Sequence, residues 1–169
     1  MDAEAIKALQ APLKARYRET PEAAVITLHS EGDVEAGGVA CKVDTGRALV
    51  VAGLHPASGG DGTLACSGDM LLDALVACAG VTLKAVSTSL GITLKHAVVR
   101  AEGDLDFRGT LGISKEAPVG FRDIRLKFDL DTDEPADRIE TLIRLTERYC
   151  VIYQTLKAPP PLSTTLGGQ

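Results

Sequence analysis

Residues 66–91 read CSGDMLLDALVACAGVTLKAVSTSLG, and this stretch decides the fold. Only two residues of 70–90, Asp73 and Lys84, are charged, so a helix here has almost no polar face. A helix that is apolar nearly all round belongs inside a core rather than on a surface. We therefore predict a long, buried central helix with the other elements packed around it.

Both ends of this segment carry helix-boundary signals. Ser67 is a candidate N-cap, and Asp69 places negative charge in the first turn, where the helix dipole favours it. Gly91 is a natural left-handed stop. Near the middle, Cys78 lies among alanines and a glycine, so a second backbone or a substrate can approach its sulfur closely. Because a free cysteine on an apolar helix is usually a small buried hydrophobe, both interpretations of Cys78 stay open at this point.

The bulk composition describes one ordinary globular domain, alone or with an extra terminal helix. The chain has 169 residues, of which 45% are hydrophobic and 24% are charged. A net charge of −5, with 4% aromatic residues and no Trp, argues against a nucleic-acid-binding surface. No uninterrupted apolar run has the length of a membrane span, and residues 1–10, MDAEAIKALQ, do not resemble a signal peptide. We expect a cytoplasmic protein with neither nucleic-acid nor membrane partners.

The chain contains four cysteines: Cys41, Cys66, Cys78 and Cys150. In a reducing compartment they are not a disulfide framework by default. They form no C-x-x-C pair and their separations match no common zinc-binding pattern, so we expect neither a metal nor another cofactor. A zinc site assembled from distant cysteines and His55 is the weaker alternative, because a single loop histidine is usually structural or solvated.

Alternating apolar residues predict a first group of strands before the central helix. We expect an antiparallel meander of three strands, at 23–29, 38–43 and 48–52. Turn-forming residues at 31–33 and 44–46 separate them.

A second group of elements follows the central helix. Residues 93–107 and 121–130 alternate well and are expected to pair as strands. An amphipathic helix at 136–148 lies over the sheet, a short helix at 151–157 follows it, and 162–166 is a final edge strand. This order of elements predicts an α+β fold.

Cys150 falls at the start of the short helix predicted after it. A cysteine in that position meets backbone N–H groups and the positive end of the helix dipole, both of which stabilise a thiolate. Arg144 and Arg148 are also close in sequence. From the residues alone, Cys150 is therefore a better thiolate candidate than Cys78.

Two motifs together resemble a known family. Residues 59–92, GGDGTLACSGDMLLDALVACAGVTLKAVSTSLGI, have the L-x-x-A-L-x-x-C helix of the OsmC/Ohr family of thiol-dependent peroxidases. Residues 145–156, LTERYCVIYQTL, resemble the family's second cysteine at the end of a late amphipathic helix. The likeness covers about 37–166. It implies antiparallel sheets around the buried helix of an OsmC-like domain, which we place at 21–169, after an N-terminal helical extension at 1–20. It also implies an intertwined homodimer with active sites at the subunit interface.

The resemblance also implies roles for particular residues. Cys78 is similar to the peroxidatic cysteine and Cys150 to the resolving cysteine of these hydroperoxide reductases, which reduce organic hydroperoxides and are recycled by a dithiol reductant of lipoyl type. Family members use an acid to orient an arginine that stabilises the thiolate. Asp69 is the nearest acid here, and Arg47 is the candidate arginine, against Arg16 and Arg18.

Two other functions are compatible with the same sequence. A non-catalytic protein of this fold would use an apolar cleft to bind a small ligand. A metal or redox sensor would use a set of thiols and an imidazole, namely Cys66, Cys78, Cys150 and His55.

Overall fold

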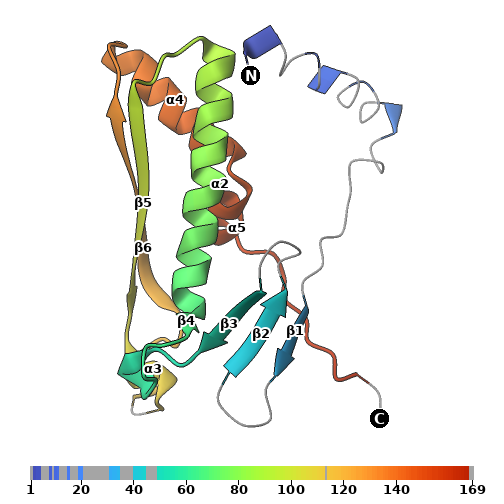
Figure 1. Ribbon diagram of the computed structural model, residues 1–169, viewed down its shortest axis with the longest axis vertical. Coiled ribbons are helices and arrows are strands. Elements are labelled where there is room, and N and C mark those ends of the chain that lie inside the picture. The colour runs from blue at the N-terminus through green and yellow to red at the C-terminus, as the bar shows by residue number, and fades with distance from the viewer. Residues whose placement is uncertain are drawn as a thin grey trace. The chain divides into compact units, whose positions relative to one another are not determined.

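The structure is a computed structural model, and it describes residues 2–4, 8, 10–11, 15, 19–20, 31–34, 40–44, 49–112 and 114–167. Within these residues, two groups of strands are separated by one long helix, in the order labelled in Figure 1. The fold is α+β, as predicted. The chain divides into two compact units: the first comprises Met1–Asp73 and Arg100–Lys127, and the second comprises Ala74–Val99 and Phe128–Gln169.

The first unit contains a four-stranded sheet with the strand order β1-β2-β3-β4. Its strands are β1 (Glu31–Val34), β2 (Ala40–Asp44), β3 (Leu49–Gly53) and the short β4 (Ala65–Cys66). The first three strands pair antiparallel, whereas β4 pairs parallel to the end of β3. The strands predicted at 38–43 and 48–52 are therefore confirmed, with small shifts of their ends.

Two other predictions for this region have different outcomes. The strand predicted at 23–29 lies outside the described residues. Residues 31–33, predicted as a turn from the sequence Glu-Gly-Asp, belong to β1 instead, so that prediction is wrong. The backbone there pairs with β2, with Glu31 opposite Asp44, and this pairing overrides the local turn preference of Gly and Asp.

The two strands after the central helix form a second sheet. As predicted, β5 (His96–Leu105) pairs with β6 (Phe121–Asp131). A single helical turn, α3 (Phe107–Thr110), lies between them in the chain.

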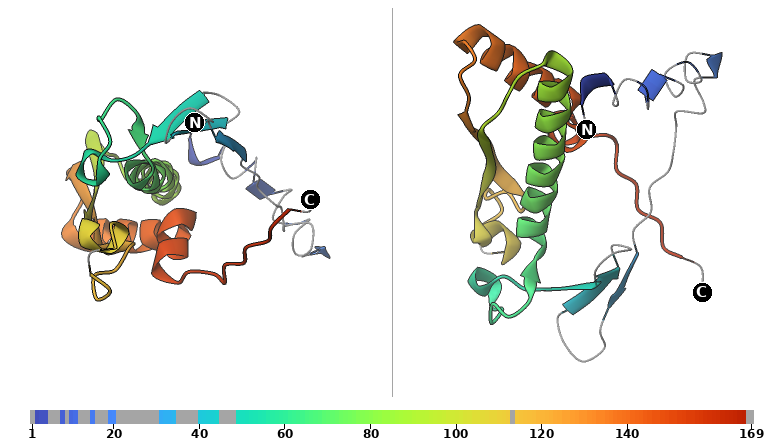
Figure 2. Two further views of the ribbon diagram at one scale, coloured as in Figure 1. Left: turned by 90° about the horizontal axis from the view of Figure 1, so that it is seen from below. Right: turned by 45° about the horizontal axis from the view of Figure 1, so that its top comes forward.

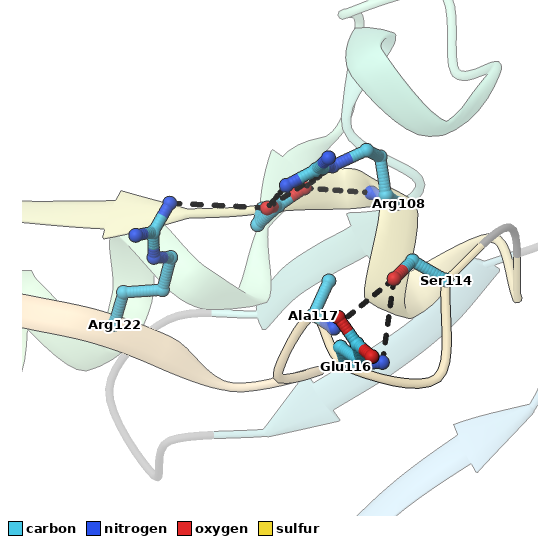
Figure 3. A network of polar contacts seen from close by, with 6 residues as sticks. Arg108, Ser114, Glu116, Ala117 and Arg122 are labelled. Carbon is cyan, nitrogen blue, oxygen red and sulfur yellow. Dashed lines mark hydrogen bonds and ion pairs between the residues drawn. The ribbon is translucent and has the colours of Figure 1, made fainter.

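Asp106 caps this helical turn and organises the charges around it. Its carboxylate accepts the backbone N–H of Arg108 and pairs with the guanidinium groups of Arg108 and Arg122 (Figure 3). The side-chain hydrogen bond from Arg108 is the main contact that lowers the pKa of Asp106 to about 2. The turn after β5 is thus held by a carboxylate that stays ionised at any ordinary pH.

The central helix α2 (Ser67–Leu90) is one unbroken helix of 24 residues (Figures 1 and 2). The predicted N-cap role of Ser67 is wrong, because β4 continues to Cys66 and Ser67 already lies in the first turn. The predicted end is confirmed: Gly91 has a φ of 66°. The N–H groups of Gly91 and Ile92 donate to the carbonyls of Thr88 and Ser87, which together make a Schellman motif.

Within the second unit, α2 buries one stripe rather than its whole circumference. Leu75, Ala79, Leu83 and Ser87 follow one another at four-residue spacing and are at most 2% exposed, whereas Val81 is 73% exposed. All-round burial is therefore not reached in a single copy of the chain. With a mean hydropathy of 1.7, α2 is long and apolar enough to cross a membrane. Core helices of soluble proteins can have the same length and composition, so this property alone does not indicate a membrane span.

Two helices complete the second unit. The first, α4 (Ala136–Tyr149), begins directly after Pro135, and α5 (Val151–Lys157) is the short helix expected after it. The fully buried Leu142 of α4 packs with Leu83 and Ile92 in the core of this unit.

The end of the described chain differs from the prediction. Residues 158–167 form no strand, so the edge strand predicted at 162–166 is wrong. Leu162 and Leu166 are each 95% exposed. Strand preference reflects packing against neighbours, and these residues have no such packing to stabilise an extended pairing.

Candidate functional site

Two sulfur atoms from distant parts of the chain meet in the second unit. Cys78 lies in the middle of α2 and is half-buried, whereas Cys150 is 1% exposed. Cys150 forms the junction at which α4 ends and α5 begins. Each of the two thiols changes the pKa of the other, so the fold brings together the two cysteines that were paired from the sequence.

The first turn of α5 directs backbone N–H groups at Cys78. The backbone N–H of Ile152, the thiol of Cys150 and the backbone N–H of Val151 each lower the pKa of Cys78. Burial alone would raise the pKa of Cys78, but these donors outweigh it and lower the pKa below that of an ordinary thiol. Cys78 is therefore the sulfur that this site stabilises as a thiolate.

Helix geometry explains why these donors are available. The first N–H groups of a helix have no carbonyl partner one turn earlier. In α5, the N–H of Gln154 donates to the carbonyl of Cys150, one turn earlier, at 3.0 Å. The Glu147 carbonyl at the end of α4 accepts from the side chain of Gln154 at 2.8 Å instead. The N–H groups of Val151 and Ile152 thus point out of the helix end.

N–H groups of this helix start act on Cys150 as well, as its sequence position predicts, but burial outweighs them there. The sequence analysis expected these N–H groups to hold a thiolate on Cys150. Burial raises the pKa of Cys150, and the neighbouring Cys78 raises it further, although the N–H groups of Tyr153 and Ile152 oppose both effects. The nearby cation does not reverse this: the guanidinium of Arg148 lies over the ring of Tyr149, 5.6 Å from its centroid. Cys150 is the protonated partner of the pair.

Thr82 makes a further contact one turn along α2. Its hydroxyl donates to the Cys78 carbonyl at 2.8 Å and also contributes a hydrogen bond that lowers the pKa of Cys78. One hydroxyl proton serves one acceptor at a time, so we ascribe the stabilisation of the thiolate chiefly to the other three donors.

The two other predicted site residues are placed differently. Arg47, like the alternatives Arg16 and Arg18, lies outside the described residues. Asp69 lies in the first turn of α2, within the first unit, where it helps to line a hollow of about 360 Å³. The largest contributions that lower the pKa of Cys78 come from uncharged groups: the N–H of Ile152, the thiol of Cys150 and the N–H of Val151.

His55 has a structural role in the first unit. Its Nδ1 accepts the N–H of Ala57 at 3.0 Å, and its ring stacks on Phe107 with 5.0 Å between the centroids. The described part of the chain contains no group of three or more His, Cys, Asp or Glu side chains that could hold a metal ion. A metal site built from His55 and the cysteines therefore has no support here.

Two of the groups that lower the pKa of Cys78, the N–H groups of Ile152 and Val151, were not predicted from the sequence. Val151 and Ile152 act through their backbones, and their side chains carry no chemical signal. Only their position in the sequence could have indicated them. Both residues begin a short helix directly after a cysteine, and neither is a proline, so both have a backbone N–H.

Comparison with known proteins shows what the chain is similar to. The family model described as OsmC-like protein matches residues 60–165. No curated protein matches the sequence. Among solved structures, an OsmC-like protein from Mycoplasma pneumoniae superposes with a TM-score of 0.66 at 14% identity, covering 79% of this chain and 89% of that one.

Two further structures have the same fold. An organic hydroperoxide resistance protein from Elizabethkingia anophelis, with thiocyanate bound, has a TM-score of 0.64 at 14% identity, covering 80% of this chain and 91% of that one. An organic hydroperoxide resistance protein from Legionella pneumophila has a TM-score of 0.61 at 16% identity, covering 80% and 92%. At such identities the likeness shows a common fold.

Proposed function

Because this chain belongs to the OsmC-like protein family, whose model matches residues 60–165, we propose that it is a thiol-dependent peroxidase that reduces organic hydroperoxides. The observation that carries the proposal is that Cys78, whose pKa is lowered, lies beside the buried Cys150, whose pKa is raised. In this scheme Cys78 is the peroxidatic cysteine and Cys150 the resolving cysteine. Proteins of the same fold that are organic hydroperoxide resistance proteins support the choice of substrate.

The reaction follows from the two protonation states. The Cys78 thiolate attacks one oxygen of the peroxide, so that an S–O bond forms and the O–O bond breaks. The other oxygen leaves as an alkoxide, which takes up a proton to become the alcohol, and Cys78 becomes a sulfenic acid. The Cys150 sulfur then attacks it, and an S–S bond forms as the hydroxyl leaves with the thiol proton as water. An external dithiol of lipoyl type reopens this bond by exchange and is itself oxidised to a disulfide.

The remaining assignments belong to the same proposal. Arg47 and Asp69 have auxiliary roles, as a cation near the thiolate and the acid that orients it. Residues 1–20 are an N-terminal helical extension of a domain at 21–169, and the protein acts in the cytoplasm. Val81, an apolar neighbour of Cys78 on α2 that is 73% exposed, suits the alkyl part of an organic hydroperoxide.

Replacing Cys150 with serine tests the order of events. In Cys150→Ser, one equivalent of cumene hydroperoxide can oxidise Cys78, but no resolving thiol follows, so the sulfenic acid should accumulate. Dimedone labelling followed by peptide mass spectrometry is expected to find the label on Cys78 in this variant. In the native protein the same treatment should yield a Cys78–Cys150 disulfide.

The matched control is Cys66→Ser, which removes a half-buried thiol of the first unit and should still form the disulfide. If cumene hydroperoxide leaves both thiols of the native protein unreacted, the peroxidase proposal fails. A non-catalytic protein that binds a small ligand would then be the better description.

We also propose that the protein is a homodimer, as the family resemblance implies. The second unit exposes large apolar side chains, with Val81 73%, Val151 67% and Tyr149 60% exposed in one copy. A second copy of the chain that covered these side chains would remove them from water. We expect light scattering after size exclusion to give a dimer for the native protein and a monomer for Val81→Arg. The control Val119→Arg, at a similarly exposed position in the first unit, should remain dimeric. A native monomer at micromolar concentration would contradict the dimer.

A further inference from the structure

We propose that the first unit contains a binding site for a small organic cation, an ammonium group carried on an aromatic or aliphatic body. The site is the hollow of about 360 Å³ at the start of α2, where β4, α3, the end of β5 and the start of β6 come together (Figure 1). Every residue that lines this hollow belongs to the first unit, whereas Cys78 and Cys150 belong to the second. The inference therefore goes beyond the proposed peroxidase function and does not rest on it.

The hollow has apolar walls that other contacts hold in place. Four of its lining side chains are apolar, namely Leu72, Leu105, Phe107 and Phe121. The ring of Phe121 lies so close to Gly103 that a Cβ there would come within 2.4 Å of it, so glycine is required for this packing. The ring of Phe107 stacks on that of His55, whose Nδ1 accepts the N–H of Ala57 at 3.0 Å. Because these walls are already ordered, a ligand loses little affinity to ordering them.

The charged side chains of the hollow favour a cation. Two carboxylates line it, Asp69 and Asp104, and no lysine or arginine among the described residues does. Asp104 is already neutralised by Arg125, whose guanidinium donates to both of its carboxylate oxygens at 2.6 and 2.8 Å. The carboxylate of Asp69 has no hydrogen bond or ion pair with another described residue. Asp69 is therefore the charge that a ligand can neutralise.

The start of α2 has the opposite effect, which is smaller. A helix start carries a partial positive charge of about half a unit, which would favour an anion. Asp69 places a full negative charge in this same first turn, so the carboxylate outweighs the dipole. Aromatic rings such as Phe107 and Phe121 also attract a cation that lies over their faces, and they pack against its apolar part. A ligand that is both apolar and positively charged thus matches the walls and the charge of the hollow.

Cys66 provides a reporter for this site, because its half-buried thiol lines the hollow. A bound ligand should shield Cys66 from iodoacetamide, while Cys78, in the second unit, serves as the internal control. The native protein is titrated with phenethylamine in the absence of peroxide, and peptide mass spectrometry gives the alkylation rate of each cysteine. We expect saturable protection of Cys66 and an unchanged rate at Cys78.

Two further probes separate charge from shape. Phenethyl alcohol has the same body as phenethylamine but no charge, and phenylacetate carries a negative charge instead. Because an ion pair with an exposed carboxylate contributes up to about a fivefold gain in affinity, the alcohol should need about five times the concentration of the amine for half protection of Cys66. Phenylacetate should protect more weakly still. Equal protection by all three probes would overturn the proposal.

A charge-removing variant tests the role of Asp69. Asp69→Asn keeps the size of the side chain but removes its charge, so the amine should lose its advantage of about fivefold over the alcohol. Asp73→Asn is the matched control, since it makes the same change one turn further along α2, at an exposed residue that does not line the hollow. It should titrate like the native protein. Identical titrations of Asp69→Asn and the native protein with phenethylamine would refute the proposal, as would a failure of the amine to protect Cys66 in the native protein.

The outcome is separable from that of the proposed function, in which Asp69 has an auxiliary role. If phenethylamine protects Cys66 as expected but peroxide never oxidises Cys78, the cation site stands and the peroxidase role falls. If the Cys78–Cys150 disulfide forms with peroxide while Cys66 stays unprotected, the peroxidase stands and the cation site falls.

Discussion

Cys78→Ser is expected to abolish the dithiol-dependent reduction of cumene hydroperoxide, with a loss of about a thousandfold or more in rate. A serine hydroxyl in the same place stays protonated at neutral pH and is a poor nucleophile toward an O–O bond. The three donors that hold a thiolate on Cys78 cannot compensate, because they stabilise an anion that serine does not form. The initial rate of hydroperoxide loss, with excess dithiol, measures the effect.

The control for this prediction is Cys66→Ser, because it makes the same chemical change at another half-buried thiol. Its rate should match that of the native protein. Both variants should also melt like the native protein, since serine and cysteine are nearly the same size and Cys78 is only half-buried. A Cys78→Ser variant that retains its rate, or a Cys66→Ser variant that loses it, would mean that the wrong sulfur has been assigned.

The elements with strong local signals were the ones that the sequence predicted well. The charge-poor run of 70–90 and the left-handed stop at Gly91 located α2, and Pro135 located the start of α4. Regular alternation located β5 and β6. In each case one segment carries the whole pattern, so neighbouring elements are not needed to interpret it.

The predictions that failed depended on what a segment packs against. Residues 31–33 have turn composition but pair with β2, and 162–166 have strand composition but remain exposed without a partner. Likewise, α2 is apolar all round, yet one copy of the chain covers only one stripe of it. The composition of a segment does not determine which neighbouring element it pairs with or packs against.

In the candidate site, too, the residues could be predicted from single segments, whereas their environment could not. Cys78 and Cys150 could be identified from the sequence, because the residues around them resemble the two cysteine motifs of a known family. The sequence could not tell which thiol has the lower pKa, because that depends on burial and on the N–H groups around each sulfur. The N–H groups of this helix start act on both sulfurs, and the pKa of Cys150 is nevertheless raised because that thiol is buried.

Leu142→Ala is expected to cost the most stability of any change considered, about 2–5 kcal/mol in the free energy of unfolding. Leu142 is fully buried and packs with Leu83 and Ile92, so truncation removes apolar contacts and leaves a cavity that the neighbours fill only in part. Leu162→Ala is the matched control, since the same substitution at a position 95% exposed should change stability by less than about 0.5 kcal/mol.

Urea denaturation followed by circular dichroism measures both changes, at one protein concentration because a dimer's stability depends on it. The midpoint for Leu142→Ala should fall well below that of the native protein, while Leu162→Ala should coincide with it. The same core holds α4 against α2, and the end of α4 carries Cys150. Leu142→Ala should therefore also speed the alkylation of the buried Cys150 thiol, because a weaker core opens more often. Equal midpoints for the two leucine variants would show that Leu142 is not part of the core that positions the two sulfurs.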